Sequence, residues 1–159
     1  MRARSLSGAL LALALIVGAA VPAYAEGAEV TSGRFVTLPG GEGLGYEISG
    51  VAVMVRAPAR GGTTAVMAIV RGLEGDTTYP THVHNAPCSA SPAGGGHYQH
   101  QVDGSVDAVN EIWPTVETGH GGVGIGMARH DHRARAEAQS IVIHYPQDTA
   151  IRLACVDLV

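Results

Sequence analysis

The chain has 159 residues, a formal net charge of −4 with histidine neutral, and no lysine. Without the first 25 residues, 8 arginines stand against 14 acidic residues, which gives a net charge of −6. An acidic surface that lacks lysine argues against a nucleic-acid partner and against binding to anionic membranes.

The N-terminus has the three parts of a secretory signal peptide. Arg2 and Arg4 make a short positive region, residues 9–20 are almost purely apolar, and Ala23-Tyr24-Ala25 matches the small-x-small pattern of a cleavage site. The apolar run of about a dozen residues is shorter than the roughly 20 that a spanning helix needs, so we expect no stable membrane anchor. We predict cleavage after Ala25 and a secreted or extracytoplasmic protein, in the periplasm or outside the cell.

The rest of the chain is long enough for one domain. Residues 26–42 carry turn formers such as Pro39-Gly40-Gly41, so we expect a flexible leader with one short strand near residues 34–38. The folded domain is then expected to span residues 43–159.

Apolar runs bounded by turn signals predict β-strands in that domain. The first two, residues 51–56 and 63–70, flank Arg60-Gly61-Gly62 and form a predicted hairpin. Residues 86–110 hold clusters of Pro, Gly and Ser, so they are interpreted as a long functional loop. No segment has a helical apolar stripe, which favours an all-β sandwich or barrel. Further strands are expected at residues 79–85, 123–128, 139–145 and 150–158.

Cys88 and Cys155 are the two cysteines of the chain. Two cysteines in an exported protein most simply form one disulfide. That bond would close a loop of about 67 residues and stabilise the fold by about 4 kcal/mol in the chain-entropy model. Metal-ligating or free thiols are the alternative.

All eight histidines lie at or after residue 82. His82 and His84 have the i, i+2 spacing that puts both side chains on one face of a strand. His97 follows three glycines in the long loop, and His144 ends a predicted strand. Four imidazoles from three segments suit Cu(II), Zn(II) or Ni(II). Copper has the highest intrinsic affinity for such sites, but the spacing alone does not choose the metal.

Together these motifs resemble the copper–zinc superoxide dismutase family, in the same order and from about residue 51 to the C-terminus. The resemblance implies a Greek-key β-sandwich or flattened barrel of about eight antiparallel strands, with a long metal-binding loop. The matching segments are His82-Val83-His84, Cys88, Gly95-Gly96-His97-Tyr98, residues 140–144 (SIVIH) and Arg152-Leu153-Ala154-Cys155.

The resemblance also implies the metal ligands. His82, His84 and His144 correspond to the three permanent copper ligands of the family. His97 corresponds to the histidine that bridges copper and zinc, and that passes a proton to the product.

Two further assignments come from the resemblance. Cys88 and Cys155 correspond to the family's disulfide within one subunit, and Arg152 to the arginine beside copper that attracts the superoxide anion. Members of the family often form homodimers, so a second copy of this chain is an expected partner alongside the substrate superoxide.

Two features of the copper–zinc enzymes are missing. Glu111 falls where the zinc-binding aspartate would be, and Ala108 where the last zinc histidine would be. Only seven residues separate His144 from Arg152, too few for the family's long electrostatic loop. Both losses resemble the copper-only branch of the superfamily and argue against a bound zinc ion. Glu111 is then expected either to hydrogen-bond and orient His97, or to be a solvated loop carboxylate.

The remaining histidines match no ligand position of the family. His100 lies only three residues after His97 and is not a substitute for a missing zinc ligand. We expect His120, His130 and His132 to be surface residues, with an accessory metal site as the alternative.

The sequence thus predicts an exported, copper-dependent superoxide dismutase. One rival is a non-catalytic copper-binding or copper-buffering protein with the same fold, but an anion-guiding Arg152 has no use in buffering. The other is a different β-fold with an H-x-H pair, such as a cupin. Cupins carry a glutamate shortly after that pair, and residues 86–90 contain none.

Overall fold

The computed structural model describes residues 27–58 and 62–159. The predicted signal peptide, residues 1–25, and most of the predicted turn Arg60-Gly61-Gly62 lie outside this range. Within it, no helix is long and apolar enough to span a membrane. In chain order the elements are β1 (Glu29–Arg34), β2 (Val36–Thr37), α1 (Pro39–Gly43), β3 (Ser49–Arg56), β4 (Thr64–Arg71), β5 (Thr78–Tyr79), β6 (Thr81–His84), β7 (Val116–Thr118), β8 (Val123–His130), β9 (Ser140–Tyr145) and β10 (Asp148–Asp157).

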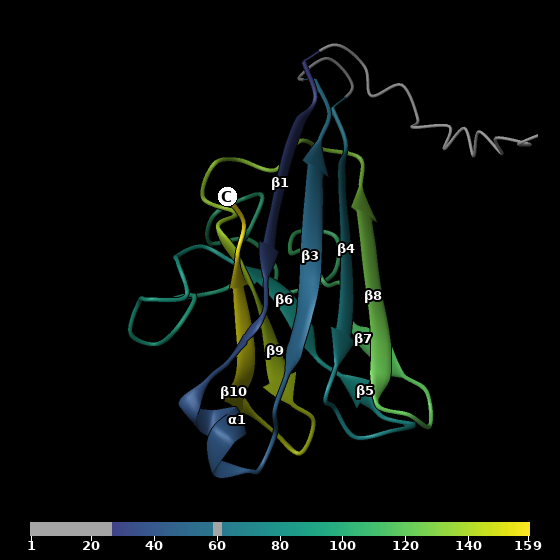
Figure 1. Cartoon of the computed structure of the whole chain (residues 1–159). Coiled ribbons are helices and arrows are strands. Elements are labelled where there is room, and N and C mark those ends of the chain that lie inside the picture. The colour runs from purple at the N-terminus through teal and green to yellow at the C-terminus, as the bar shows by residue number, and fades with distance from the viewer. Residues whose placement is uncertain (1–26, 59–61) are drawn as a thin grey trace, which may run out of the picture.

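The strands form two antiparallel sheets packed as a sandwich (Figure 1). One sheet has the order β1-β3-β4-β8-β7-β5 and the other the order β2-β10-β9-β6. The predicted all-β sandwich is confirmed. It has ten strands in the described residues rather than about eight, and two separate sheets rather than a closed barrel. β4 pairs with β8 although three strands lie between them in the sequence, a long return connection of the Greek-key kind.

Strand β4 of the six-stranded sheet alternates strictly between buried and exposed residues. Its buried side chains, which include Val66 and Val70, join Met54 of β3 in the core between the sheets. Because successive side chains of a strand point to opposite faces, Met67 and Ile69 face outward. Full burial of one such aliphatic side chain stabilises the fold by about 1.5–3 kcal/mol.

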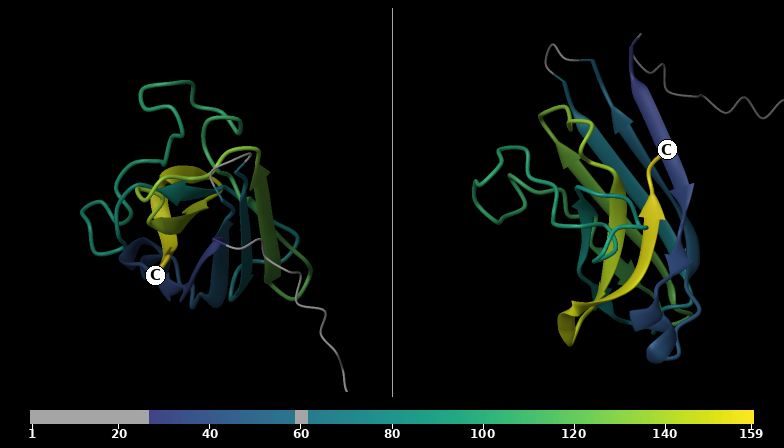
Figure 2. Two further views of the ribbon diagram at one scale, coloured as in Figure 1. Left: turned by 90° about the horizontal axis from the view of Figure 1, so that it is seen from above. Right: turned by 90° about the vertical axis from the view of Figure 1, so that its left-hand side faces the viewer.

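Strand β9 of the four-stranded sheet is buried on both faces. Ile141 and Ile143 belong to the core, while Val142 and His144 face the opposite way. The segment between β6 and β7, residues 85–115, covers that outer face, and we call it the site loop. Figure 2 shows it projecting from the side of β6, β9 and β10.

Two expectations from the sequence differ from the structure. The described part of the predicted flexible leader, residues 27–42, is folded, because β1 pairs with β3 along its whole length and β2 pairs with β10. The short strand expected near residues 34–38 is present as β2. The short strand β7 was not predicted. Both segments have weak apolar alternation of their own, so the strands beside them decide their conformation.

Candidate metal centre

Three of the four predicted ligands lie on one face of the four-stranded sheet. β6 pairs with β9 so that His82 lies opposite Val142 and His84 opposite Ser140. These residues and His144 share the face that the site loop covers. The alternation of the two strands, readable in the sequence, therefore brings three imidazoles to one place.

The fourth ligand, His97, comes from the site loop. It pairs with His84 in an isolated β-bridge, which folds the loop back over β6. Gly94 and Gly95 make this possible with positive φ values of 82° and 68°. A Cβ atom on Gly94 would lie 3.2 Å from Cβ of His84, too close to be accommodated freely. The glycines before His97 are thus required both for the turn and for the close approach.

Two rings are oriented by backbone carbonyl groups. Nδ1 of His144 donates to the carbonyl oxygen of Thr149 at 2.7 Å. Nδ1 of His84 lies 3.3 Å from the carbonyl oxygen of Gly95. Both bonds fix the ring orientation and leave Nε2 free, as is usual for histidines that bind metals.

The rings of His97 and His82 differ in which nitrogen is free to bind a metal. His97 uses Nδ1 to donate to Oε2 of Glu111 at 2.7 Å, so its Nε2 is free. Nδ1 of His82 is buried and has no hydrogen-bond partner among the described residues. Because a buried polar atom without a partner is costly, His82 Nδ1 is the atom of that ring that most needs a ligand.

The four nitrogens converge on one point. One ligand atom from each of His82, His84, His97 and His144, which we call the tetrad, lies within 4.8 Å of all the others. Nε2 of His84 and Nε2 of His144 are 3.2 Å apart. Metal–nitrogen bonds of about 2.0 Å place neighbouring ligands about 2.8–3.3 Å apart and opposite ligands about 4 Å apart. The tetrad therefore fits a metal ion, and four nitrogen donors without sulfur or oxygen suit Cu(II), Zn(II) or Ni(II).

Burial favours the neutral form of three rings of the tetrad, those of His82, His84 and His144. Burial, followed by the charges of His97 and His144, lowers the pKa of His82 to about 3. Burial is also the main reason that the pKa of His84 lies far below its usual range, and that the pKa of His144 falls to about 4. These rings carry free lone pairs at neutral pH, which is the state that binds metals.

Glu111 is the centre of a small hydrogen-bond network behind the tetrad. The sequence predicted that it would orient His97, and the 2.7 Å bond described above joins them. Its side chain is only 2% exposed, so it is not a solvated loop carboxylate. Trp113 Nε1 donates to the same oxygen, Oε2, at 2.8 Å, and Gln99 Nε2 donates to Oε1 at 3.3 Å.

Trp113 is a site residue that sequence reasoning missed. Its indole ring also meets the edge of the His82 ring, with 5.5 Å between centroids. Trp113 therefore contacts one ligand directly and a second one through Glu111. The Glu-x-Trp spacing was visible in the sequence, but only the structure shows that both residues point at the tetrad.

Arg152 lies beside the tetrad. It pairs across the β9–β10 ladder with His144. Its positive charge contributes to the lowered pKa values of His84 and His144, after the larger effect of burial. The guanidinium donates to the carbonyl oxygen of Ala93 in the site loop. Arg152 is thus held between a sheet strand and the loop.

The predicted disulfide ties the same loop to the same strand. Cys88 and Cys155 are bonded, with Cα atoms 5.8 Å apart. Cys88 N also donates to the Asp157 carboxylate at 2.7 Å. The disulfide prediction is confirmed, and the bond fixes the site loop five residues before Ala93, the partner of Arg152.

The remaining histidines do not join the tetrad. His120 is exposed and pairs with Asp76. His130 and His132 were expected at the surface, but both are half-buried, and the His132 ring stacks on His100 with 3.6 Å between centroids. Burial, followed by the charges of His100 and His130, lowers the pKa of His132 to about 4.

In the described part of the chain, the tetrad is the one group of three or more His, Cys, Asp or Glu side chains whose ligand atoms lie this close together. Comparison of the sequence with known families finds no family model that matches, and no curated protein matches the chain either. The function therefore has to be inferred from the tetrad and its surroundings.

Proposed function

We propose that the protein is an exported superoxide dismutase of the copper-only kind. It would convert two superoxide anions and two protons into dioxygen and hydrogen peroxide. The observation that carries the proposal is the tetrad with Arg152 beside it: four imidazoles and one guanidinium gathered in one place.

The choice of copper rests on donor chemistry and on Glu111. Copper(II) has the highest affinity among the divalent metals for a site made of nitrogen donors. A copper ion held there would supply the one-electron cycle between Cu(II) and Cu(I) that oxidises one superoxide and reduces the next. In a copper–zinc site the second nitrogen of the bridging histidine binds zinc. Here that nitrogen, Nδ1 of His97, donates to Glu111, which supports a single metal ion.

His97 is the tetrad member best suited to carry a proton. Its side chain is 31% exposed, whereas His84 and His144 are buried. Glu111 holds its Nδ1 proton, so Nε2 can take a proton from solvent and donate it to the reduced product. The surrounding network of Glu111, Trp113 and Gln99 keeps the ring in one orientation during this exchange.

Arg152 is suited to attract the substrate. A guanidinium about 5 Å from an anion contributes about 1–3 kcal/mol of attraction at effective dielectric constants of about 80 to 20. The processed chain carries a net charge of −6, so a local positive charge is needed to offset the overall repulsion of superoxide. A protein that only stores copper has no need of such a residue.

The test is the rate of superoxide loss with the copper-loaded protein, compared with the same amount of free copper. The proposal expects a much faster protein-catalysed reaction, and metal analysis with one copper and no zinc per chain. Arg152→Ala should lower the rate about 10-fold while copper stays bound. Arg152→Lys should restore part of the rate, and added salt should reduce the gap between wild type and variant.

Three outcomes would count against parts of the proposal. A copper-loaded wild type no faster than free copper would favour the copper-buffering protein. Stoichiometric zinc would overturn the copper-only assignment alone. A protein found in the cytoplasm with its first 25 residues intact would contradict export.

A further inference from the structure

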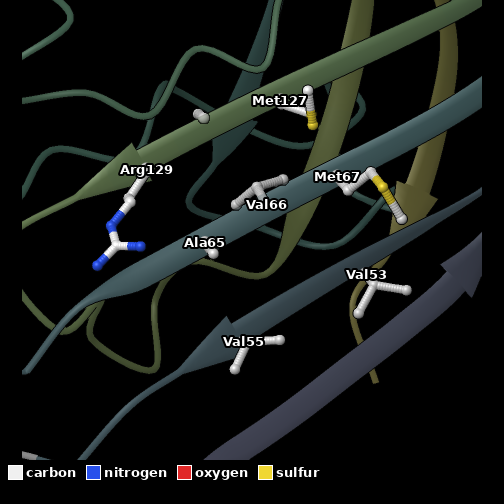
Figure 3. A pocket seen from close by; sticks show the side chains of 8 residues that line it. Val53, Val55, Ala65, Val66, Met67, Met127 and Arg129 are labelled. Carbon is white, nitrogen blue, oxygen red and sulfur yellow. The ribbon is translucent and has the colours of Figure 1, made fainter. Parts of the chain in front are cut away.

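The outer face of the six-stranded sheet carries a shallow groove with a volume of about 530 Å³, which we call the apolar groove. It crosses three neighbouring strands, β3, β4 and β8 (Figure 3). Sites for small ligands usually have volumes of about 300–1,000 Å³, so the groove is large enough for one such ligand. The outward side chains that line it are Val53, Val55, Ala65, Met67, Met127 and Arg129.

The strand register explains why the face is hollowed at this point. Ala65 of β4 lies between Val55 of β3 and Arg129 of β8. Its single methyl group is shorter than both of these side chains, and shorter than Met67, the next outward residue of β4. A short side chain among longer ones leaves a depression, so Ala65 forms the floor of the groove.

Arg129 is the one charged side chain that lines the groove. It is exposed, and in the part of the chain that the structure describes it forms no ion pair. By contrast, Arg56, Arg133 and Arg135 each pair with a glutamate. The planar guanidinium of an arginine matches a carboxylate with two parallel hydrogen bonds. Arg129 therefore offers a carboxylate an unused partner at the edge of an apolar depression.

The acidic residues of the chain leave this positive charge largely intact. Glu117 of β7 is the one acidic residue on the outer face of the described strands of this sheet. It pairs with Ile125, four residues before Arg129 on β8, which puts it about 13 Å away along the strand. That distance exceeds the Debye length of about 8 Å at physiological ionic strength, so Glu117 does little to neutralise Arg129.

We propose that the apolar groove binds a long-chain fatty acid. The acyl chain lies over Ala65 against Met67 and Met127, and the carboxylate pairs with Arg129. An uncharged hydrocarbon would have no use for the arginine, and a small anion would have no use for the apolar walls, so the combination selects an anionic amphiphile. The sandwich core separates the groove from the tetrad, so the proposal does not depend on a bound metal.

The experiment is a calorimetric titration of the protein with decanoate, a fatty acid that stays monomeric at the concentrations used. Two probes separate the contributions of chain and charge: 1-decanol has the same chain without the charge, and butyrate has the charge with a short chain. Decanoate should bind about 10-fold or more tightly than either probe, because a hydrogen-bonded ion pair and the burial of several CH₂ groups each contribute to its affinity.

Two variants test the two parts of the groove. Arg129→Gln should weaken the binding of decanoate about 10-fold or more and leave the binding of 1-decanol within about 2-fold of wild type. Ala65→Leu fills the floor of the groove and should weaken the binding of both ligands about 10-fold or more. Ala65→Ser, which keeps a short side chain, should leave it within about 3-fold. Ala65 is exposed, so these variants should fold, and circular dichroism checks that they do.

Arg71→Gln is the matched control. Arg71 is an exposed arginine on the same face, six residues further along β4, beside a second depression of about 460 Å³. Its Nε already donates to Oγ of Ser49 at 3.0 Å. The variant should leave the affinity for decanoate within about 2-fold of wild type.

Several results would overturn the proposal. Equal affinities for decanoate and 1-decanol would remove the role of Arg129, and a larger effect of Arg71→Gln than of Arg129→Gln would place the ligand at the other end of the face. A wild type that does not bind decanoate but sediments with anionic phosphatidylglycerol vesicles would show that the occupant is a lipid surface. A wild type that binds neither, and whose mass in solution rises with its concentration unless Met67 is replaced by arginine, would show that a second copy covers the groove.

Discussion

The two sheets of the sandwich have outer faces of opposite character. The four-stranded sheet carries polar histidines on its outer face, yet that face is buried because the site loop covers it. The six-stranded sheet carries Val, Ile and Met on its outer face, and there the side chains are exposed. In each case the face departs from the usual alternation of apolar inside and polar outside. The comparison teaches that such departures mark the places in a sheet at which to look for a bound ligand or partner.

The largest expected effect comes from removing a ligand on the covered face. His144→Ala should weaken copper binding by more than about 100-fold and abolish activity. Loss of a ligand should lower the copper affinity more than loss of a residue that only hydrogen-bonds a ligand. His120→Ala is the matched control, because His120 is exposed and bonded to Asp76, and it should change neither property. Copper titration and the superoxide assay measure both. Equal effects of the two substitutions would contradict the tetrad as the metal site.

The second-largest effect is expected from removing the disulfide, which joins the site loop to β10. Replacing Cys88 and Cys155 together by serine should lower the free energy of unfolding by about 4 kcal/mol, since the bond closes a loop of 67 residues. Urea denaturation of oxidised wild type and variant gives the difference. A loss below about 1 kcal/mol would mean that the site loop holds its place without the bond.

The pH dependence of the metal-free protein should reveal the buried histidines. The folded-state pKa values of His82 and His144 are lowered to about 3 and about 4, whereas an unfolded histidine titrates near 6.5. Below pH 6.5 the unfolded chain therefore binds more protons, so stability falls as the pH drops from about 6.5 to about 4. We expect the Tm to fall by at least about 5 °C over this range.

A matched variant isolates the contribution of the tetrad to that fall. The double variant His82→Gln/His144→Gln keeps hydrogen-bonding side chains there but cannot titrate. Its Tm should depend less on pH between 6.5 and 4. If the Tm of this variant depended on pH as strongly as the Tm of the wild type, groups other than these two histidines would cause the loss of stability.

A smaller effect is expected from the network behind the tetrad. Trp113→Phe removes the indole donor to Glu111 but keeps an aromatic ring beside His82. Copper affinity should fall about 10-fold, the lower end of the usual range for such partners, and the copper reduction potential and electron paramagnetic resonance spectrum should shift. Gln99→Ala removes the longer, 3.3 Å bond to Glu111 and should change these properties less. An unaltered spectrum in Trp113→Phe would show that the indole does not orient the site.

The smallest effect on stability is expected on the exposed face. Met67→Ala should change the free energy of unfolding by no more than about 0.5 kcal/mol, because Met67 faces outward. Met54→Ala on the neighbouring strand should cost about 2–5 kcal/mol, because Met54 is fully buried in the core. Urea denaturation of wild type and both variants at the same protein concentration makes the comparison. Similar losses in both variants would mean that Met67 also belongs to a packed core.

The sequence by itself determined the parts that depend on local pattern. Apolar runs bounded by turn signals predicted the long strands β3, β4, β8, β9 and β10. The period of two residues on a strand is likewise a local property. The same period put His82 and His84 on one face, and the glycines before His97 indicated a tight turn. The pairing of Cys88 with Cys155 followed from their number alone in a chain predicted to be exported.

Only the tertiary structure decided the features that depend on a partner distant in the sequence. β1 and β2 become strands because β3 and β10 offer unpaired backbone groups beside them. Trp113 reaches the tetrad because the site loop folds over β6, and His132 stacks on His100 because the same loop passes it. The packing of the whole chain decides where a loop folds back. The local pattern of residues in the sequence does not predict it. This is why the ligands were readable in the sequence, while most of the residues that surround them were not.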